Sequence, residues 1–220
     1  MERLTELANK IGRIDKGTEF LEAHGFTEFY QPYFEKILNR AISEKRKVYI
    51  LEIGVWEGSS LHLYNEFFGP ENCELYGLDI EPGYSQYHAD NVHLFRTDQD
   101  SIDLLKETAK NFGDIKFDII IDDGGHRYNQ QLNTLLAYHN LVRTDGIYII
   151  EDLHTNIDRT WGDFEDSPLN YLITKKKSNF ISVEQYLELN DIIKCATIFR
   201  RTNEKGSCEK ASITSILKVN

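Results

Sequence analysis

Hydrophobic and polar positions follow two alternating periods between about residue 48 and about residue 150. Short apolar runs closed by turn residues are typical of buried parallel strands, and they are predicted at residues 48–53, 74–80, 92–97, 117–122 and 147–151. Apolar residues at helical spacing predict helices between them at residues 59–68, 101–112 and 128–141. The alternation predicts an α/β fold with a doubly wound, mostly parallel sheet and helices on both faces.

The sequence on either side of this region is expected to cover or extend the sheet. Before the first strand, apolar residues recur at intervals of three and four and predict an amphipathic helix: Phe34, Ile37, Leu38, Ala41 and Ile42. Residues 156–178 are polar, aromatic and aperiodic, which predicts an insertion beside the functional face. Residues 192–201 and 211–219 are β-like and flank the turn-prone residues 203–207, so they predict a terminal antiparallel hairpin.

The length of 220 residues suits one α/β domain that buries a sizeable core without disulfides or a structural metal. A single domain over residues 1–220 is therefore predicted. Its expected parts are a helical N-terminal cap (1–45), a ligand-binding core (46–155), a substrate-side insertion (156–190) and a C-terminal hairpin (191–220).

Charge and cysteine content narrow the class of protein. The net charge of −11 disfavours nonspecific binding to nucleic acid or to an anionic membrane, because both depend on clustered Lys and Arg. Cys73, Cys195 and Cys208 are odd in number and widely spaced, which argues against a disulfide framework and against a zinc–thiolate site. No secretory leader or long apolar run is visible, so a cytoplasmic protein with no membrane partner is expected.

A glycine-containing turn follows the first predicted strand. Gly54 and Gly58 flank Val55-Trp56-Glu57, and Ser59 begins the next predicted helix. Glycine lets the backbone approach a ligand closely, and a helix start offers free N–H groups and a positive dipole end. The G-x-x-x-G spacing is neither the dinucleotide-binding fingerprint nor a P-loop.

Acidic residues end the second and third predicted strands. Asp79 lies 25 residues after Gly54, about what one helix and one strand require, and its carboxylate can accept both hydroxyls of a ribose. Asp98-Gln99-Asp100 follows the third strand. Together with the glycine turn, these residues predict an adenosine-containing ligand.

Two further apolar runs end in adjacent carboxylates. The run at residues 117–121 ends in Asp122-Asp123-Gly-Gly-His126, and the run at residues 147–150 ends in Glu151-Asp152. Ligands of open α/β sheets bind at the carboxyl ends of strands. These acids are therefore expected to converge on one cation or one reacting group.

These motifs resemble those of class I S-adenosylmethionine-dependent methyltransferases, whose first motif ends in E-x-G-x-x-x-G and whose second strand ends in a ribose-binding acid. Asp-Asp-Gly-Gly-His with Ile-Glu-Asp-Leu-His-Thr resembles, more narrowly, the Mg²⁺-dependent O-methyltransferases of the mycinamicin and demethylmacrocin type, which act on macrolide sugars. The resemblance covers roughly residues 52–155. Those enzymes can have longer N-terminal regions, so oligomer geometry and substrate identity do not transfer.

The resemblance implies a Rossmann-like methyltransferase sheet and a role for each matching residue. The methionine part of the cofactor would lie near Glu52, Gly54, Gly58 and Ser59, the ribose near Asp79, and the adenine near Asp98 and Gln99. The metal ligands would be Asp123, Glu151 and Asp152, and the catalytic base would be His126. Asp122 is expected to be structural or cofactor-adjacent, because only one of two successive strand-end carboxylates normally points into the pocket.

The chemistry of methyl transfer accounts for such a residue set. A sugar hydroxyl is a poor nucleophile, and a bound dication lowers the pKa of a coordinated oxygen and fixes its position. Carboxylates without thiolates suit Mg²⁺, with Mn²⁺ or Ca²⁺ as substitutes. His126 follows Asp123 by three residues and is expected beside a helix N-terminus, whose positive end favours a neutral ring that can accept a proton.

The sequence therefore predicts an S-adenosylmethionine- and Mg²⁺-dependent O-methyltransferase for a hydroxyl of a sugar or glycosylated metabolite. The expected partner is a small-molecule or glycan acceptor, and a homo-oligomer is left open. His154, Tyr128 and Trp161 are candidate lining residues, with ordinary surface or core roles as the alternative.

Three other functions are compatible with the same motifs. A catechol-type enzyme would use a phenolic acceptor, which needs less activation. A cephalosporin hydroxylase-like oxygenase would hold Fe(II) with two histidines and a carboxylate, and His126 and His154 could supply the histidines. A noncatalytic S-adenosylmethionine-binding module would leave the metal ligands and the base unexplained.

Overall fold

The computed structural model describes residues 3–19, 24–156, 171–172, 183–201 and 212–219. Most of the predicted insertion, with Trp161, and the predicted turn at 203–207 lie outside these residues. The chain divides into two compact units, Met1–Arg96 and Thr97–Asn220, and each is described by itself.

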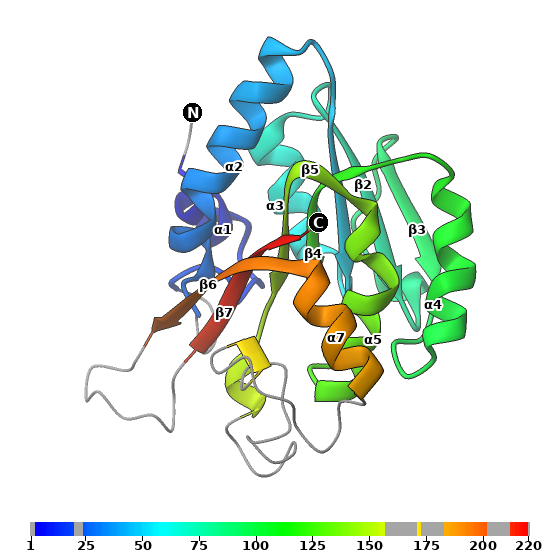
Figure 1. Ribbon diagram of the computed structural model, residues 1–220. Helices are drawn as coiled ribbons and strands as arrows, with labels where there is room; N and C mark the ends of the chain where they lie inside the picture. The colour runs from blue at the N-terminus through cyan, green and yellow to red at the C-terminus, as the bar shows by residue number, and fades with distance from the viewer. Residues whose placement is uncertain (1–2, 20–23, 157–170, 173–182, 202–211, 220) are drawn as a thin grey trace. The chain divides into compact units, whose positions relative to one another are not determined.

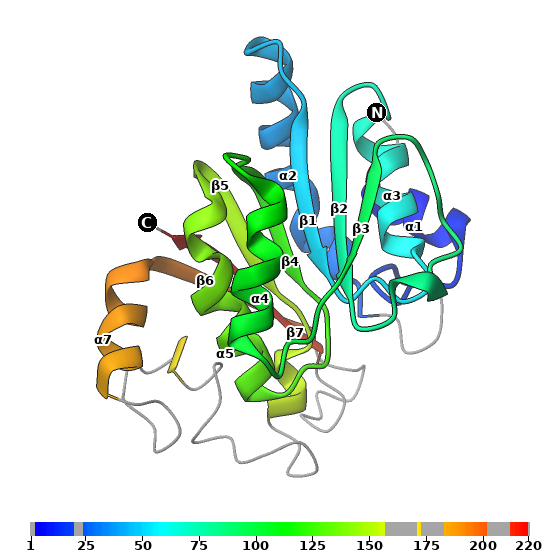
Figure 2. The same cartoon turned by 90° about the vertical axis from the view of Figure 1, so that its right-hand side faces the viewer.

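The strands of the first unit form a parallel sheet in the order β3-β2-β1 (Figure 2). They are β1 (Val48–Ile53), β2 (Cys73–Asp79) and β3 (Val92–Arg96). The three predicted strands are confirmed to within a residue at each end. In this register the last residue of β2, Asp79, follows Leu78, the partner of Ile53 at the end of β1. The acid is thus close to the glycine turn.

Helices α1 (Leu4–Ile11), α2 (Phe26–Ser43) and α3 (Ser59–Phe68) belong to the first unit, together with the short helix η1 (Pro82–Tyr84). The predicted α3 is confirmed at both ends, and the predicted helix before β1 begins earlier, at Phe26. Phe34 of α2 stacks on Tyr30 at 5.7 Å and meets Tyr64 of α3 edge-on at 5.9 Å. This aromatic packing joins α2 to α3.

In the second unit the strand order is β4-β5-β7-β6. β4 (Phe117–Asp122) and β5 (Val142–Ile150) are parallel, whereas β7 (Ser212–Val219) pairs antiparallel with β5 and with β6 (Ile193–Arg201). The predicted terminal antiparallel hairpin is confirmed. Both predicted parallel strands are also present, and every residue of β4 is buried, as a continuous apolar run requires.

The described residues of the second unit include the helices α4 (Ile102–Ala109), α5 (Tyr128–Tyr138) and α7 (Val183–Ile192) (Figure 1). They also include the short helices η2 (Lys110–Phe112), η3 (His139–Leu141) and η4 (Leu153–Asn156). The predicted helices at 101–112 and 128–141 are confirmed, each ending in a 3₁₀ turn. α7 begins inside the stretch expected to be an insertion. With both units, the fold class is confirmed as mostly parallel α/β with a terminal antiparallel hairpin.

Two further findings concern the described residues. Cys73 and Cys195 are free thiols, and burial raises the pKa of the Cys73 thiol to about 12, so it is not a reactive group. None of the helices in the described ranges is both long enough and apolar enough to cross a membrane.

Candidate cofactor and metal site

The turn after β1 has the backbone geometry expected of a cofactor loop. Gly54 and Gly58 both have φ of +85°, and Trp56 between them has φ of +47°. A Cβ atom at Gly58 would lie 2.5 Å from Oγ of Ser85. Only glycine fits there, and the half-buried Ser59 then begins α3.

Asp79 fixes this turn from the end of β2. Its Oδ2 accepts hydrogen bonds from the backbone N–H groups of Val55 (2.9 Å) and Trp56 (3.0 Å), and its Oδ1 accepts one from Glu81 (2.8 Å). A carboxylate has about four acceptor positions, so one is left for a ribose hydroxyl. The predicted ribose acid is therefore also the residue that shapes the glycine turn.

Glu52 is buried near the end of β1 and is held by side chains of its own unit. Its carboxylate is fully buried, accepts hydrogen bonds from Ser60 Oγ (2.7 Å) and Tyr64 OH (3.3 Å), and lies 4.0 Å from the Lys16 ammonium. Lys16 is itself 1% exposed. Sequence reasoning missed this lysine, because no periodicity or motif marks it.

Exposed apolar side chains flank the same turn. Trp56, Ile80 and Tyr84 are 61%, 55% and 69% exposed, although large apolar side chains are normally buried. Trp56 lies in the turn, Ile80 follows Asp79, and Tyr84 lies in η1. Such a cluster is typical of a ligand-binding surface.

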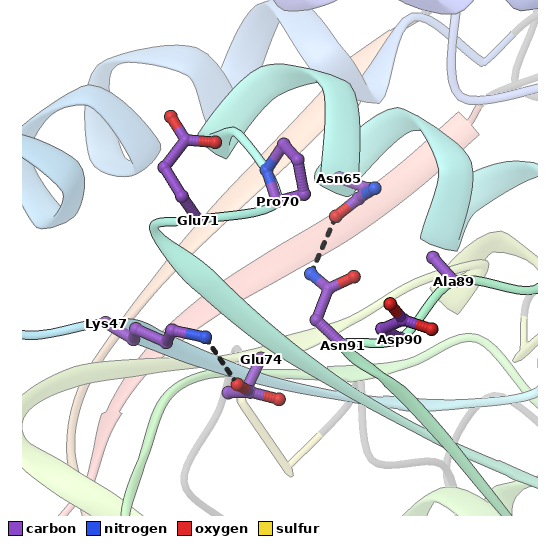
Figure 3. A pocket seen from close by; sticks show the side chains of 8 residues that line it. All are labelled: Lys47, Asn65, Pro70, Glu71, Glu74, Ala89, Asp90 and Asn91. Atoms are coloured by element: carbon purple, nitrogen blue, oxygen red, sulfur yellow. Dashed lines mark hydrogen bonds and ion pairs between the residues drawn. The ribbon is translucent and has the colours of Figure 1, made fainter.

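A separate cavity of about 660 Å³ lies at the opposite, amino ends of the strands in the first unit (Figure 3). Its polar side chains pair with one another: Lys47 with Glu74 at 2.7 Å, and Asn91 with Asn65 at 2.8 Å. The cavity is lined by Lys47, Asn65, Pro70, Glu71, Glu74, Ala89, Asp90 and Asn91. Four of its polar side chains are therefore already paired within the cavity.

In the second unit, the two residues expected near adenine differ in their surroundings. Asp98 is half-buried, and its Oδ1 accepts a hydrogen bond from the Asp100 N–H at 2.9 Å. The Gln99 side chain is buried and hydrogen-bonded to Asp122, Thr134 and Gly125. The Gln99 amide is thus used inside the unit.

Asp122 is enclosed at the end of β4. Its side chain is fully buried, Oδ1 accepts a hydrogen bond from Gln99, and Oδ2 has no hydrogen-bond partner among the described residues. Burial raises the pKa of this carboxyl to about 6. These surroundings favour the structural interpretation of Asp122 over a role in metal binding.

Asp123, His126 and Asp152 form a compact group of potential ligands. One ligand atom from each lies within 4.8 Å of the other two, and Nε2 of His126 is 3.4 Å from Oδ2 of Asp152. His126 and Asp152 have left-handed backbones, with φ of +59° and +52°. Strain of this kind in non-glycine residues is concentrated at functional sites.

Neighbouring residues frame this group. Glu151, the third expected metal ligand, is buried at the end of β5 and is not a member of the group. Oγ1 of Thr155 lies within hydrogen-bond distance of the backbone carbonyls of Asp152 (2.8 Å) and His126 (3.2 Å), which links the two segments. Thr155 was part of the sequence motif, but its linking role depends on a tertiary contact that spacing does not reveal.

Two other candidates have more ordinary surroundings. Nδ1 of His154 lies 3.7 Å from Oδ1 of Asp152 and accepts a hydrogen bond from the Ile213 N–H at 3.4 Å. Tyr128 is half-buried as the first residue of α5. His126 directly precedes the N-cap of this helix, Arg127, so its expected position beside a helix N-terminus is confirmed.

The donor set fits a hard divalent cation. Mg²⁺ is usually bound through one or two carboxylates and keeps several waters, and Asp123 and Asp152 provide two carboxylates at one place. An imidazole directly beside a carboxylate can also take a proton, because the carboxylate stabilises the imidazolium that forms. The group can therefore combine cation binding with general-base chemistry.

Comparison with known proteins identifies related sequences. Residues 51–153 match a family described as a methyltransferase domain. Mycinamicin VI 2''-O-methyltransferase of Micromonospora griseorubida is 34% identical over 141 residues, which cover 60% of this chain and 32% of that protein. Demethylmacrocin O-methyltransferase of Streptomyces fradiae is 36% identical over 144 residues, with the same coverage. The chain thus spans about a third of the length of these relatives.

Solved structures show the same fold. The methyltransferase MycE of the mycinamycin pathway, in complex with Mg, S-adenosylhomocysteine (SAH) and mycinamycin VI, superimposes with a TM-score of 0.69 at 23% identity. The match covers all of this chain and 55% of that chain. A putative O-methyltransferase from Klebsiella pneumoniae superimposes with a TM-score of 0.52 at 15% identity. This match covers 99% of this chain and 88% of the Klebsiella chain. The expected Rossmann-like methyltransferase fold is confirmed.

Proposed function

We propose that the protein is an S-adenosylmethionine- and Mg²⁺-dependent O-methyltransferase, because residues 51–153 match a family described as a methyltransferase domain and the fold is that of Rossmann-like methyltransferases. Its acceptor is a hydroxyl of a sugar or glycosylated metabolite. The observation that supports this most directly is the grouping of Asp123, His126 and Asp152.

The first unit is proposed to bind the cofactor. The left-handed glycines Gly54 and Gly58 and the start of α3 at Ser59 leave room for the methionine part. Asp79 retains an acceptor position for the ribose, and the exposed Ile80 and Tyr84 offer apolar surface to the adenosine part. MycE was solved with SAH, which supports this assignment.

The second unit is proposed to bind and activate the acceptor. Asp123 and Asp152 would hold Mg²⁺, with Glu151 as the third protein ligand. A cation bound there would lower the pKa of the acceptor hydroxyl and fix its oxygen for in-line attack. Nε2 of His126 takes the proton, and the Asp152 carboxylate 3.4 Å away stabilises the resulting imidazolium.

The presence of a proposed base favours a sugar acceptor over a phenol. An aliphatic hydroxyl must be deprotonated as it attacks, whereas a phenol with a pKa near 10 needs less help. A chain that keeps an imidazole beside the metal ligands is better matched to the harder acceptor. The relatives named for methylation at sugar positions, such as the 3'-O-methyltransferase of a rhamnosyl-tetracenomycin from Streptomyces olivaceus, support the same choice.

One observation favours a second candidate, an Fe(II) oxygenase. Imidazole nitrogens of both His126 and His154 lie within 4 Å of the Asp152 carboxylate, at 3.4 Å and 3.7 Å. Two histidines and one carboxylate are the ligands of a facial-triad iron site. Metal analysis of the purified protein separates the two candidates, because Mg²⁺ or an exchangeable cation is expected and stoichiometric iron would favour the oxygenase.

Methyl transfer itself tests the proposal. Purified protein, methyl-labelled S-adenosylmethionine and Mg²⁺ are incubated with a panel of rhamnosides with free hydroxyls and, separately, with catechol. We expect label on a rhamnoside, lost in excess EDTA and restored by Mg²⁺. Full activity in EDTA would contradict the metal role. Transfer to catechol alone, insensitive to His126→Ala, would instead favour the phenolic function.

A further inference from the structure

The segment after β3 contacts the turn that contains the proposed base. Nε2 of Gln99 donates to Oδ1 of Asp122 at 2.8 Å, and Oε1 of Gln99 accepts a hydrogen bond from the Gly125 N–H at 2.8 Å. One amide group therefore contacts both the residue before Asp123 and the residue before His126. All of these contacts lie within the second unit.

The turn needs an external support of this kind. Two consecutive glycines, Gly124 and Gly125, separate Asp123 from His126, and glycine has the greatest backbone freedom of any residue. A Cβ atom at Gly124 would lie 1.9 Å from Oε1 of Gln99, so the amide packs directly against the turn backbone. The position of His126 relative to Asp123 depends on what holds these glycines.

Gln99 is itself held firmly. It is 9% exposed, and its Nε2 donates to Oγ1 of Thr134 at 2.9 Å as well as to Asp122. Its backbone carbonyl accepts a hydrogen bond from Asn133 at 3.0 Å. Both N–H bonds of the amide are thus used within the protein, and neither is left to contact a base.

We propose that Gln99 is a positioning residue for the metal and base turn, rather than the adenine contact that its place in the sequence suggests. It acts by fixing the Gly124-Gly125 backbone and, through it, the positions of Asp123 and His126. This inference rests on the proposed function for the roles of Asp123 and His126. Asp98, the preceding half-buried residue, remains available for the adenine.

The proposal predicts a separation of metal affinity from cofactor affinity. Partners that orient metal ligands are typically worth about 10–100-fold in metal affinity or activity. Gln99→Ala should weaken Mn²⁺ binding, measured by electron paramagnetic resonance, by about tenfold or more and lower kcat by a similar factor. The Kd for SAH, measured by calorimetry, should change by less than about threefold.

Asn111→Ala is the matched control. Asn111 also hydrogen-bonds a backbone carbonyl through its amide, that of Thr108 at 3.0 Å, but it lies in η2 away from the turn. This variant should keep the wild-type values of all three constants. Loss of SAH affinity in Gln99→Ala, with Mn²⁺ binding unchanged, would overturn the proposal and restore the adenine contact.

A charge swap tests whether the hydrogen bond itself matters. Gln99→Glu places two carboxylates together and should impair Mn²⁺ binding and kcat at least as much as Gln99→Ala. Adding Asp122→Asn recreates the pair with donor and acceptor exchanged. The kcat of the double variant should therefore be at least about tenfold higher than that of Gln99→Glu alone. No recovery in a folded double variant would contradict a role for this contact. Failure of the wild-type protein to bind Mn²⁺ would count against the proposed function instead.

Discussion

Nε2 of His126 lies 3.4 Å from Oδ2 of Asp152. The two residues come from different strand ends, and both have left-handed backbones. Oγ1 of Thr155 lies within hydrogen-bond distance of the backbone carbonyl of each. The proposed base, His126, is thus next to a proposed metal ligand, Asp152.

Removal of the base should affect catalysis and leave the cofactor in place. General-base catalysis typically contributes about 10²–10⁴-fold, so His126→Ala should lower kcat on a sugar acceptor by that range. The Kd for SAH should not change. His139→Ala is the control, since His139 lies in η3 and its Nδ1 is 3.2 Å from the Leu135 carbonyl oxygen. Equal activity of His126→Ala and wild type would exclude the assigned role.

Loss of a metal ligand should remove the stabilisation that Mg²⁺ provides. A ligand that binds only the folded state raises the melting temperature, so Mg²⁺ should raise the Tm of the wild-type protein in a concentration-dependent way. Residues that only orient metal ligands are worth about 10–100-fold in metal affinity. Asp123→Asn and Asp152→Asn each remove a ligand itself, so each should weaken Mg²⁺ binding by more than about 100-fold and abolish the Tm shift. Asp114→Asn, an exposed control, should keep the shift. A shift that survives in both ligand variants would place the cation elsewhere.

The glycine turn should tolerate no side chain at Gly58. Its φ of +85° is strained for other residues, and an added Cβ would meet Ser85 Oγ at 2.5 Å. Gly58→Ala should lower the free energy of unfolding by about 1–3 kcal/mol and weaken SAH binding by about tenfold. The control is Gly83→Ala, because an added Cβ there meets nothing within 4 Å. Similar SAH affinities of the two variants would argue against a cofactor turn.

The buried Asp122 should make stability depend on pH. Burial raises its pKa from 3.8 to about 6, so between these pH values the folded protein binds more protons than the unfolded chain. The free energy of unfolding therefore falls as pH rises through this window. An asparagine side chain does not ionise, so Asp122→Asn should not lose this stability. The free energy of unfolding of the variant minus that of the wild type should therefore rise by on the order of 3 kcal/mol from a pH below this window to a pH above it. Urea unfolding in EDTA at several pH values measures the difference, and a pH-independent difference would rule out this origin.

The strands were predictable because buried strands have short, continuous apolar sequences. β1 and β4 were found at their exact ends for this reason. β5 begins at Val142 and not at residue 147, because Arg143, Thr144 and Asp145 interrupt the apolar pattern at a register shift. α1 lies within the expected helical N-terminal cap, but its bounds were not predicted, because its packing on other helices, and not its short sequence, defines it.

The site was predictable where position along a strand determines it. Asp79, Asp123, His126 and Asp152 follow strands or glycines whose geometry the sequence carries, and three of these four residues form the group in the second unit. The direction of a side chain is a tertiary property. Gln99 follows a strand end as an adenine contact would, yet its amide turns to Asp122 and Gly125.

A crystal structure with Mn²⁺ and SAH tests the central claim most directly. The account predicts an anomalous manganese peak at about 2.1 Å from carboxylate oxygens of Asp123 and Asp152. It also predicts SAH against Gly54 and Gly58, with its ribose at Asp79. A peak bound by His126 and His154, or SAH bound away from the glycine turn, would contradict a metal-assisted methyl transfer by this protein.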